Sequence, residues 1–122
     1  MTTILIAEDN RVNQRMLAFT LRKNDYTVIT AMHGLEALDQ MEATPIDLVI
    51  ADIDMPEMDG ISLVKHLRAN KRYQLLPIIV LTASGDDEDY NIARAAGADD
   101  VLTKPASSRE LISTIEKMLK QQ

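Results

Sequence analysis

Short, nearly continuous apolar runs alternate along this chain with segments whose apolar residues repeat at helical spacing. A strand that is covered by other elements on both faces carries apolar residues at consecutive positions, because each face of the sheet is buried. The runs therefore predict five buried strands, at residues 4–7, 27–30, 48–51, 78–81 and 101–102.

Helices are predicted between and after these strands. In most of them, apolar residues recur every three or four positions, and we expect the face that they share to pack on the sheet. These stripes are Val12–Met16–Phe19, Leu35–Leu38–Met41, Ile61–Val64–Leu67 and Leu111–Ile115–Met118, the last preceded by a Ser107–Glu110 capping box.

One further helix is predicted between residues 86–89 and Gly97. The four acids at 86–89 suit a helix start, and glycine suits the position just past a helix end. Only Ile92 and alanines are available for the core-facing side of this helix. We therefore expect it to be loosely held.

Strand and helix thus alternate five times, which predicts an α/β fold with a parallel sheet, right-handed crossovers and helices on both faces. The chain has no internal repeat and no linker-like segment, and its 122 residues suit one domain over residues 1–122. In such sheets, ligand sites form outside the carboxyl ends of the strands.

Composition narrows the function classes. The net charge is −6, no block is rich in Lys and Arg, and aromatic residues make up 3% of the chain, so we expect no direct contact with nucleic acid. The chain has no cysteine, which excludes disulfides and thiolate metal sites. The apolar run at 4–7 is too short for a signal peptide or a membrane span, and we expect a cytoplasmic protein that does not contact a membrane.

Chemically capable residues follow the predicted strands. Adjacent strands lie under about 5 Å apart, so their carboxyl ends can bring these residues together. They are Glu8–Asp9 after the first strand, Asp52 after the third, Thr82–Ala83–Ser84 after the fourth and Thr103–Lys104–Pro105 after the fifth.

Such a cluster would hold three carboxylates, a hydroxyl and an ammonium. Carboxylates crowded together either take up protons or bind a cation, and an all-oxygen set favours a hard ion such as Mg²⁺. The lysine and the threonine suit phosphate oxygens, so the set indicates phosphoryl transfer, with a carboxylate as candidate covalent acceptor. Each residue alone is more often a solvated loop or capping residue; the hypothesis depends on all of them meeting at one edge. These arguments leave the choice between Asp52 and Asp54 open.

Four segments carry a resemblance that covers essentially the whole chain: Glu8–Asp9, "DIDMPEMDG" at 52–60, "LTAS" at 81–84 and "GADDVLTKP" at 97–105. In this order they resemble the receiver domain of two-component response regulators. The segment "AEDNRVNQ" at 7–14 further resembles receivers attached to hybrid sensor kinases. The resemblance implies a flavodoxin-like (βα)5 fold with strand order 2-1-3-4-5.

The resemblance also implies a phosphorelay role. Asp52 would accept a phosphoryl group from a phosphohistidine on a sensor histidine kinase or a histidine phosphotransfer protein. Mg²⁺ would be held by Asp9, Asp52 and the backbone carbonyl of Asp54, with Glu8 acting mainly through water. The domain would phosphorylate and dephosphorylate itself and would not be a turnover enzyme.

Other residues of the family pattern would bind and report the phosphoryl group. Thr82, Ala83 and Lys104 would contact its oxygens, Thr82 would move towards it, and the Lys104–Pro105 bond would be cis. A downstream effector or a second copy of the chain would bind the face made by the fourth helix, fifth strand and fifth helix.

Two positions raise separate questions. Receivers usually carry Tyr or Phe where this chain has Val101, so we hypothesise that signalling depends more on movement of the loosely held fourth helix. Asp54 and Ser84 each follow a site residue by two positions and are expected to flank attacking water and tune the phosphoryl lifetime. In the same loop, Asp59 is expected to cap the next helix and Glu57 to be solvated.

Two alternatives remain open at this point. Asp52-Ile-Asp54 is a D-x-D sequence that resembles the nucleophile motif of haloacid-dehalogenase-type phosphatases, although there it follows the first strand. The other alternative is a docking module that keeps the fold without being phosphorylated, for which loss of a site residue would be the usual mark.

Overall fold

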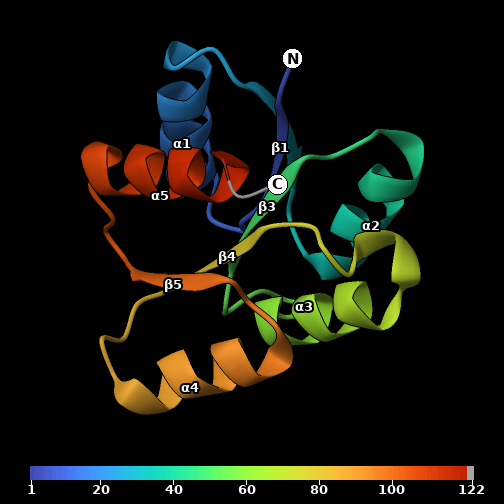
Figure 1. Ribbon diagram of the computed structural model, residues 1–122. Helices are drawn as coiled ribbons and strands as arrows, with labels where there is room; N and C mark the ends of the chain where they lie inside the picture. The colour runs from blue at the N-terminus through green and yellow to red at the C-terminus, as the bar shows by residue number, and fades with distance from the viewer. Residues whose placement is uncertain (121–122) are drawn as a thin grey trace.

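The computed structural model describes residues 1–120 and shows a parallel sheet covered by helices (Figure 1). The strands are β1 (Thr3–Ala7), β2 (Thr27–Ala31), β3 (Leu48–Asp52), β4 (Ile78–Thr82) and β5 (Asp100–Thr103). The helices are α1 (Arg11–Lys23), α2 (Gly34–Ala43), α3 (Gly60–Ala69), α4 (Asp87–Ala96) and α5 (Ser108–Lys120), with a 3₁₀ turn η1 (Lys71–Tyr73). Within these residues, no helix is both long and apolar enough to cross a bilayer.

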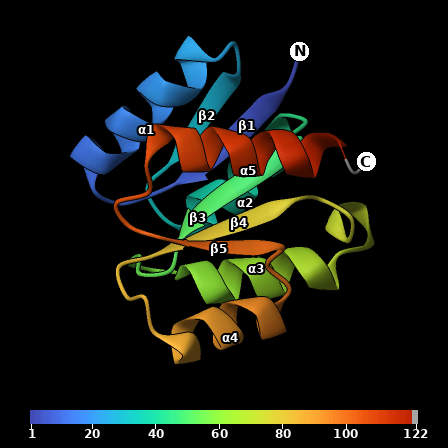
Figure 2. The same cartoon turned by 60° about the vertical axis from the view of Figure 1, so that its left-hand side comes forward.

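The sheet has the order β2-β1-β3-β4-β5, which confirms the predicted flavodoxin-like topology. Helices α1 and α5 cover one face, and α2, α3 and α4 cover the other (Figures 1 and 2). Every residue of β3 and β4 is buried, because successive side chains enter the two cores in turn. This burial on both faces is the physical reason for the continuous apolar runs in the sequence.

The core-facing stripes were predicted correctly for α3 and α5 and wrongly for α1. Val12, Met16 and Phe19 are 66%, 63% and 67% exposed, whereas Ala18 and Leu21 are buried against the sheet. Helix α1 carries two apolar stripes, and the stripe with Ala18 and Leu21 is the one that packs on the sheet. The small side chain of Ala18 lets the helix lie close to the strands. In α2, the predicted Leu35 is likewise exposed, while Met41 is buried.

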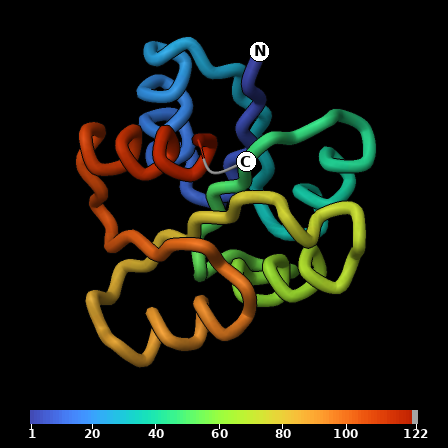
Figure 3. Tube along the Cα trace, in the orientation of Figure 1, coloured from blue at the N-terminus to red at the C-terminus, as the bar shows by residue number. Residues whose placement is uncertain are grey.

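Helix α4 is held by little apolar contact, as predicted, and of the predicted Ile92 and alanines it is an alanine that is buried. Ile92 is 44% exposed, and Ala93 is the buried residue of this helix. The trace shows α4 at the outside of the molecule, beside β5 and α3 (Figure 3). Its last turn is tied down by polar contacts, since Arg68 of α3 donates from Nε to the carbonyl of Gly97 at 2.9 Å. Its first turn has no comparable polar contact, because Asp86 occupies the N-cap position but its side chain makes no capping hydrogen bond.

Candidate functional site

Three acids meet at the carboxyl edge of the sheet. Glu8 follows β1 directly, Asp9 follows Glu8, and Asp52 is the last residue of β3. One carboxylate oxygen from each lies within 4.8 Å of the other two. Glu8 is 1% and Asp52 4% exposed, whereas Asp9 is open to solvent. The donor set is all oxygen and reachable from one side, which fits a hard divalent cation that keeps some of its water.

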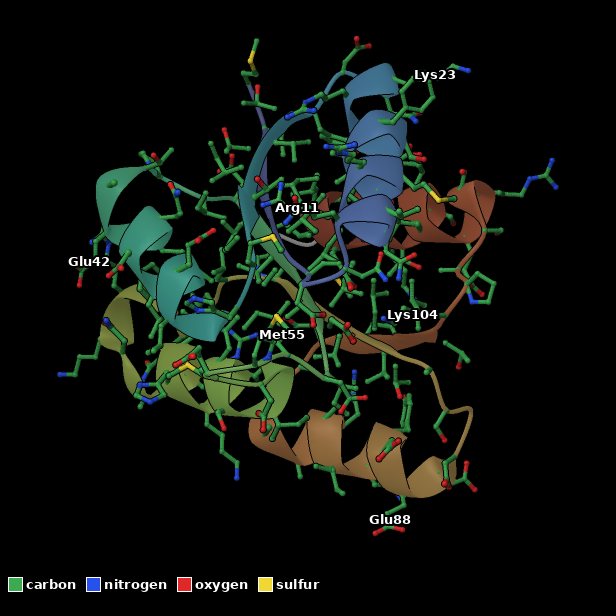
Figure 4. All side chains as sticks on the ribbon, turned by 180° about the vertical axis from the view of Figure 1, so that it is seen from behind. Arg11, Lys23, Glu42, Met55, Glu88 and Lys104 are labelled. Carbon is green, nitrogen blue, oxygen red and sulfur yellow. The ribbon has the colours of Figure 1, made fainter. Side chains whose placement is uncertain are left out.

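Lys104 reaches this cluster from the loop after β5 (Figure 4). Its Nζ lies 2.9 Å from Asp52 Oδ2 and 3.5 Å from Glu8 Oε2. Its main-chain N–H donates to the carbonyl of Thr82 at 2.7 Å, which fixes the loop to the end of β4. The Lys104–Pro105 bond is cis, as the resemblance implied.

The charges of the cluster perturb one another. Burial raises the pKa of Glu8, and the nearby charge of Asp52 raises it further. Burial alone would lower the pKa of Lys104, but its hydrogen bond and ionic interaction with Asp52, together with Glu8, raise it overall. The site therefore holds its negative charges under mutual repulsion, which a cation would relieve.

The loop between β3 and α3 packs closely on the backbone of Asp52. Asp54 N donates to Asp52 Oδ1 at 3.2 Å, so each oxygen of that carboxylate has a partner. A Cβ on Gly60 would lie 2.3 Å from the Asp52 carbonyl oxygen, so only glycine lets α3 begin here. Asp59 Oδ1 accepts from Ser62 N at 2.7 Å, which confirms the predicted cap, and Glu57 is exposed.

Thr82 lies at the end of β4 and is 3% exposed. Its hydroxyl oxygen Oγ1 accepts from Ser84 N at 3.1 Å. Within residues 1–120, this hydroxyl makes no hydrogen bond to Asp52 or to Lys104. Ser84 Oγ accepts from Asp86 N at 3.1 Å, while Ala83 is exposed. The β4–α4 loop thus links the candidate hydroxyl directly to the start of α4.

Val101 lies in β5 three residues before Lys104, and Asp54 follows Asp52 by two residues. Val101 is half-buried, pairs with Val80 in the sheet and packs against the core beneath α3 and α4. The Asp54 side chain is exposed. The structure therefore brings Glu8, Asp9, Asp52 and Lys104 into one cluster, with Thr82 at its edge.

Two supporting residues were not singled out from the sequence. Asn10 N donates to Glu8 Oε1 at 3.1 Å, and Asn10 Oδ1 accepts from Asn13 N to cap α1. Gln14 Nε2 donates to the carbonyl of Glu8 at 3.1 Å. An Asn directly before a helical segment is a capping signal that could have identified the first; the second has no signal in the sequence beyond the motif at 7–14.

Comparison with known proteins matches this geometry to one family. The family model for the response regulator receiver domain matches residues 4–116. The chain is 37% identical over 117 residues to the alkaline phosphatase synthesis transcriptional regulatory protein PhoP of Bacillus subtilis. That alignment covers 96% of this chain and 48% of PhoP, so the chain spans about half the length of the curated relatives it matches.

Solved structures agree with the sequence match. The signal receiver domain of a signal transduction histidine kinase from Syntrophus aciditrophicus superposes with a TM-score of 0.93 at 33% identity, covering 99% of this chain and 92% of that one. The receiver domain of the sensor histidine kinase PA1611 from Pseudomonas aeruginosa PAO1 superposes with a TM-score of 0.90 at 32% identity and 98% coverage of both chains. The latter was crystallised with a magnesium ion coordinated in its active site cleft.

Proposed function

Because this chain belongs to the receiver domain family of two-component response regulators, we propose that Asp52 is the residue that accepts the phosphoryl group. The observation that carries this choice is the double contact of its carboxylate with Lys104 Nζ and Asp54 N, inside the cluster of acids. Asp54, the other member of the D-x-D sequence, is exposed and has only its main chain in the site. Of the two acids of the D-x-D sequence, Asp52 is therefore the one whose carboxylate has a fixed orientation.

The proposed reaction is an in-line displacement. A carboxylate oxygen of Asp52 attacks the phosphorus of a phosphohistidine, a P–O bond forms, the P–N bond breaks, and the imidazole leaves with its electron pair. Water later attacks the phosphorus of the acyl phosphate, the P–O bond to Asp52 breaks, and inorganic phosphate leaves as the Asp52 carboxylate is restored. Mg²⁺ held by Asp9, Asp52 and the Asp54 carbonyl, with Glu8 acting mainly through water, would stabilise the charge on the transferring group.

The side chains around Asp52 would bind that group. Lys104 Nζ already lies 2.9 Å from Asp52 and can contact a phosphoryl oxygen with the same ammonium. Thr82 would exchange its hydrogen bond with Ser84 N for one to the phosphoryl group, with Ala83 N as a neighbouring donor. Because the β4–α4 loop connects these residues to α4, this exchange would change the surface that α4 presents.

The donor would be a sensor histidine kinase or a histidine phosphotransfer protein, and it must reach Asp52 from the open side of the site. Helix α1 begins two residues after Asp9 and exposes the stripe Val12–Met16–Phe19. Basic residues Arg11, Arg15, Arg22 and Lys23 flank that stripe on an otherwise acidic chain. An apolar surface with acidic flanks on the donor would fit it.

Output would use the face of α4, β5 and α5, through an effector or a second copy of the chain. β5 is an edge strand, and Tyr90 of α4 is 43% exposed beside the hollow on this face. Asp99, Asp100 and Lys117 border a hollow on this face. Exposed apolar residues rimmed by charges are typical of a surface that binds another protein.

Intact-mass measurement after incubation with acetyl phosphate and Mg²⁺ tests the acceptor. We expect one phosphoryl group to add to the wild type and none to add to Asp52→Ala, whereas the control Asp59→Ala should be labelled normally. Absence of labelling with any donor would contradict the proposal. Sustained hydrolysis of a generic phosphate ester would instead support the phosphatase alternative, which the family match does not favour.

A further inference from the structure

Gln14 holds the backbone on both sides of Asp9. Its main-chain N–H donates to the carbonyl of Asn10 at 2.9 Å, and its side-chain amide donates to the carbonyl of Glu8 at 3.1 Å. The Glu8–Asp9 peptide group is thus held by the side chain of Gln14, and the Asn10–Arg11 peptide group by its main chain in the first turn of α1.

The same amide also ties two strands together. Gln14 Nε2 donates to the carbonyl of Ala31, the last residue of β2, at 3.2 Å, and Glu8 N donates to that carbonyl at 3.0 Å. Nε2 also lies 3.4 Å from Met32 Sδ, a weak acceptor. A reversed amide would place Oε1 against two carbonyl oxygens, so the donor group is the one that fits. Gln14 therefore fixes the loop where it leaves the sheet.

Asp9 has no comparable anchor of its own. Its side chain is exposed and, within residues 1–120, makes no hydrogen bond, whereas Glu8 is held by Asn10 N and Lys104. The Asp9 carboxylate nevertheless lies within 4.8 Å of two like charges, which repel it. Its place in the cluster is therefore set by the backbone that carries it.

We propose that Gln14 is a positioning residue that holds Asp9 towards the cation site and so sets the affinity of the site for a divalent cation. This inference rests on the proposed function, because it assumes that the acids bind Mg²⁺. The Gln14 side chain makes no hydrogen bond to the carboxylates of the cluster within the described residues; it acts through the carbonyl of Glu8, which it holds beside that of Ala31.

The test replaces the amide by groups of similar size. Gln14→Met removes the N–H donors without adding a charge, and Gln14→Ala removes the side chain if the methionine variant does not fold. Gln40→Met is the control, since Gln40 is also half-buried on a helix and its side chain makes no hydrogen bond within the described residues. The Mg²⁺ dissociation constant of each unphosphorylated protein is measured by calorimetry, and the rate of labelling by acetyl phosphate is measured as a function of Mg²⁺ concentration.

We expect Gln14→Met to raise the Mg²⁺ dissociation constant about tenfold, with a labelling rate at saturating Mg²⁺ within about twofold of the wild type. Gln40→Met should change nothing. An unchanged dissociation constant in Gln14→Met, or an equal loss in Gln40→Met, would overturn the inference. If the wild type binds Mg²⁺ but is never labelled, the proposed function is contradicted, and the dissociation constants still decide the role of Gln14. If the wild type does not bind Mg²⁺, both the proposed function and the role of Gln14 are overturned.

Discussion

Lys104 and Asp52 meet across the carboxyl edge of the sheet, with Nζ 2.9 Å from Oδ2. The ammonium therefore lies where the oxygens of a phosphoryl group arriving at Asp52 would carry negative charge during the transfer. Positioned cations of this kind contribute to the transition state more than to the ground state. The contact therefore predicts a kinetic role for Lys104.

Replacing Lys104 by Met should slow labelling by acetyl phosphate roughly 10²-fold at saturating Mg²⁺. A time course of intact mass measures the rate. Lys65→Met on the exposed side of α3 is the matched control, because it removes an equal charge away from the site. Equal rates in the two variants would show that the Lys104 ammonium does not assist the transfer.

Glu8 should destabilise the cation-free protein near neutral pH. Its pKa is raised above the ordinary value of 4.5, first by burial and then by Asp52, so the folded state binds this proton more tightly than the unfolded chain does. The unfavourable contribution is absent below pH 4.5 and grows as the pH rises through the raised pKa.

Glu8→Gln mimics the protonated side chain and should raise the melting temperature at pH 7 without divalent cation. At pH 4 or below, the two proteins should melt together, because Glu8 is then protonated in the wild type as well. Thermal unfolding followed by circular dichroism at both pH values checks this. A Glu8→Gln protein that melts below the wild type at pH 7 would contradict the assigned direction.

The two apolar stripes of α1 should differ in their effect on stability. Leu21 is fully buried, so Leu21→Ala should lower the free energy of unfolding by about 2–5 kcal/mol. Phe19 is 67% exposed, so Phe19→Ser should change it by less than about 0.5 kcal/mol. Urea denaturation measures both. A large loss in Phe19→Ser would mean that this ring packs inside the protein.

The sequence was sufficient to predict the topology, because burial on both faces of a parallel sheet leaves a mark that few other structures share. All five strands were found where the apolar runs lie, and the sheet order followed from the resemblance. The chemical cluster was predictable for a related reason: residues at the carboxyl ends of neighbouring parallel strands must be close together.

Helix orientation was harder to predict. A stripe of apolar residues shows that a helix is amphipathic, but α1 has two stripes, and the larger side chains of Met16 and Phe19 were given weight over Ala18. In α4 the sequence offered Ile92 and several alanines without ranking them, and Ala93 is the one that is buried. Close approach of a helix to a sheet selects small residues, and that selection depends on tertiary packing that periodicity alone does not contain.

Asp54→Asn should change the rate at which the phosphoryl group is lost. The Asp54 side chain is exposed while its main-chain N–H donates to Asp52 Oδ1, so the carboxylate stands beside the path of attacking water and the backbone contact survives the substitution. The decay of the phosphorylated mass after removal of acetyl phosphate gives the rate constant. Equal decay in wild type and variant would show that this side chain plays no part in the lifetime.

Helix α4 should carry the conformational response. Apolar packing holds it mainly through Ala93, its last turn is tied to Arg68 through the carbonyl of Gly97, and its first turn is tied only to the loop that carries Thr82. Val101 offers no aromatic ring to move with the threonine. Movement of Thr82 would therefore loosen the N-terminal turns of α4 first and leave the end beside Arg68 in place.

Hydrogen exchange with and without beryllium trifluoride as a phosphoryl mimic tests this order of events. We expect the amides of residues 84–91 to change their protection, those of residues 93–97 to change less, and an Asp52→Asn protein to show no change. Arg68→Ala should extend the change to residues 93–97, because the polar tie at the end of α4 is then lost. Unchanged protection over residues 84–97 in the wild type would exclude α4 as the responding element and direct attention to β5 and α5, which flank the same face.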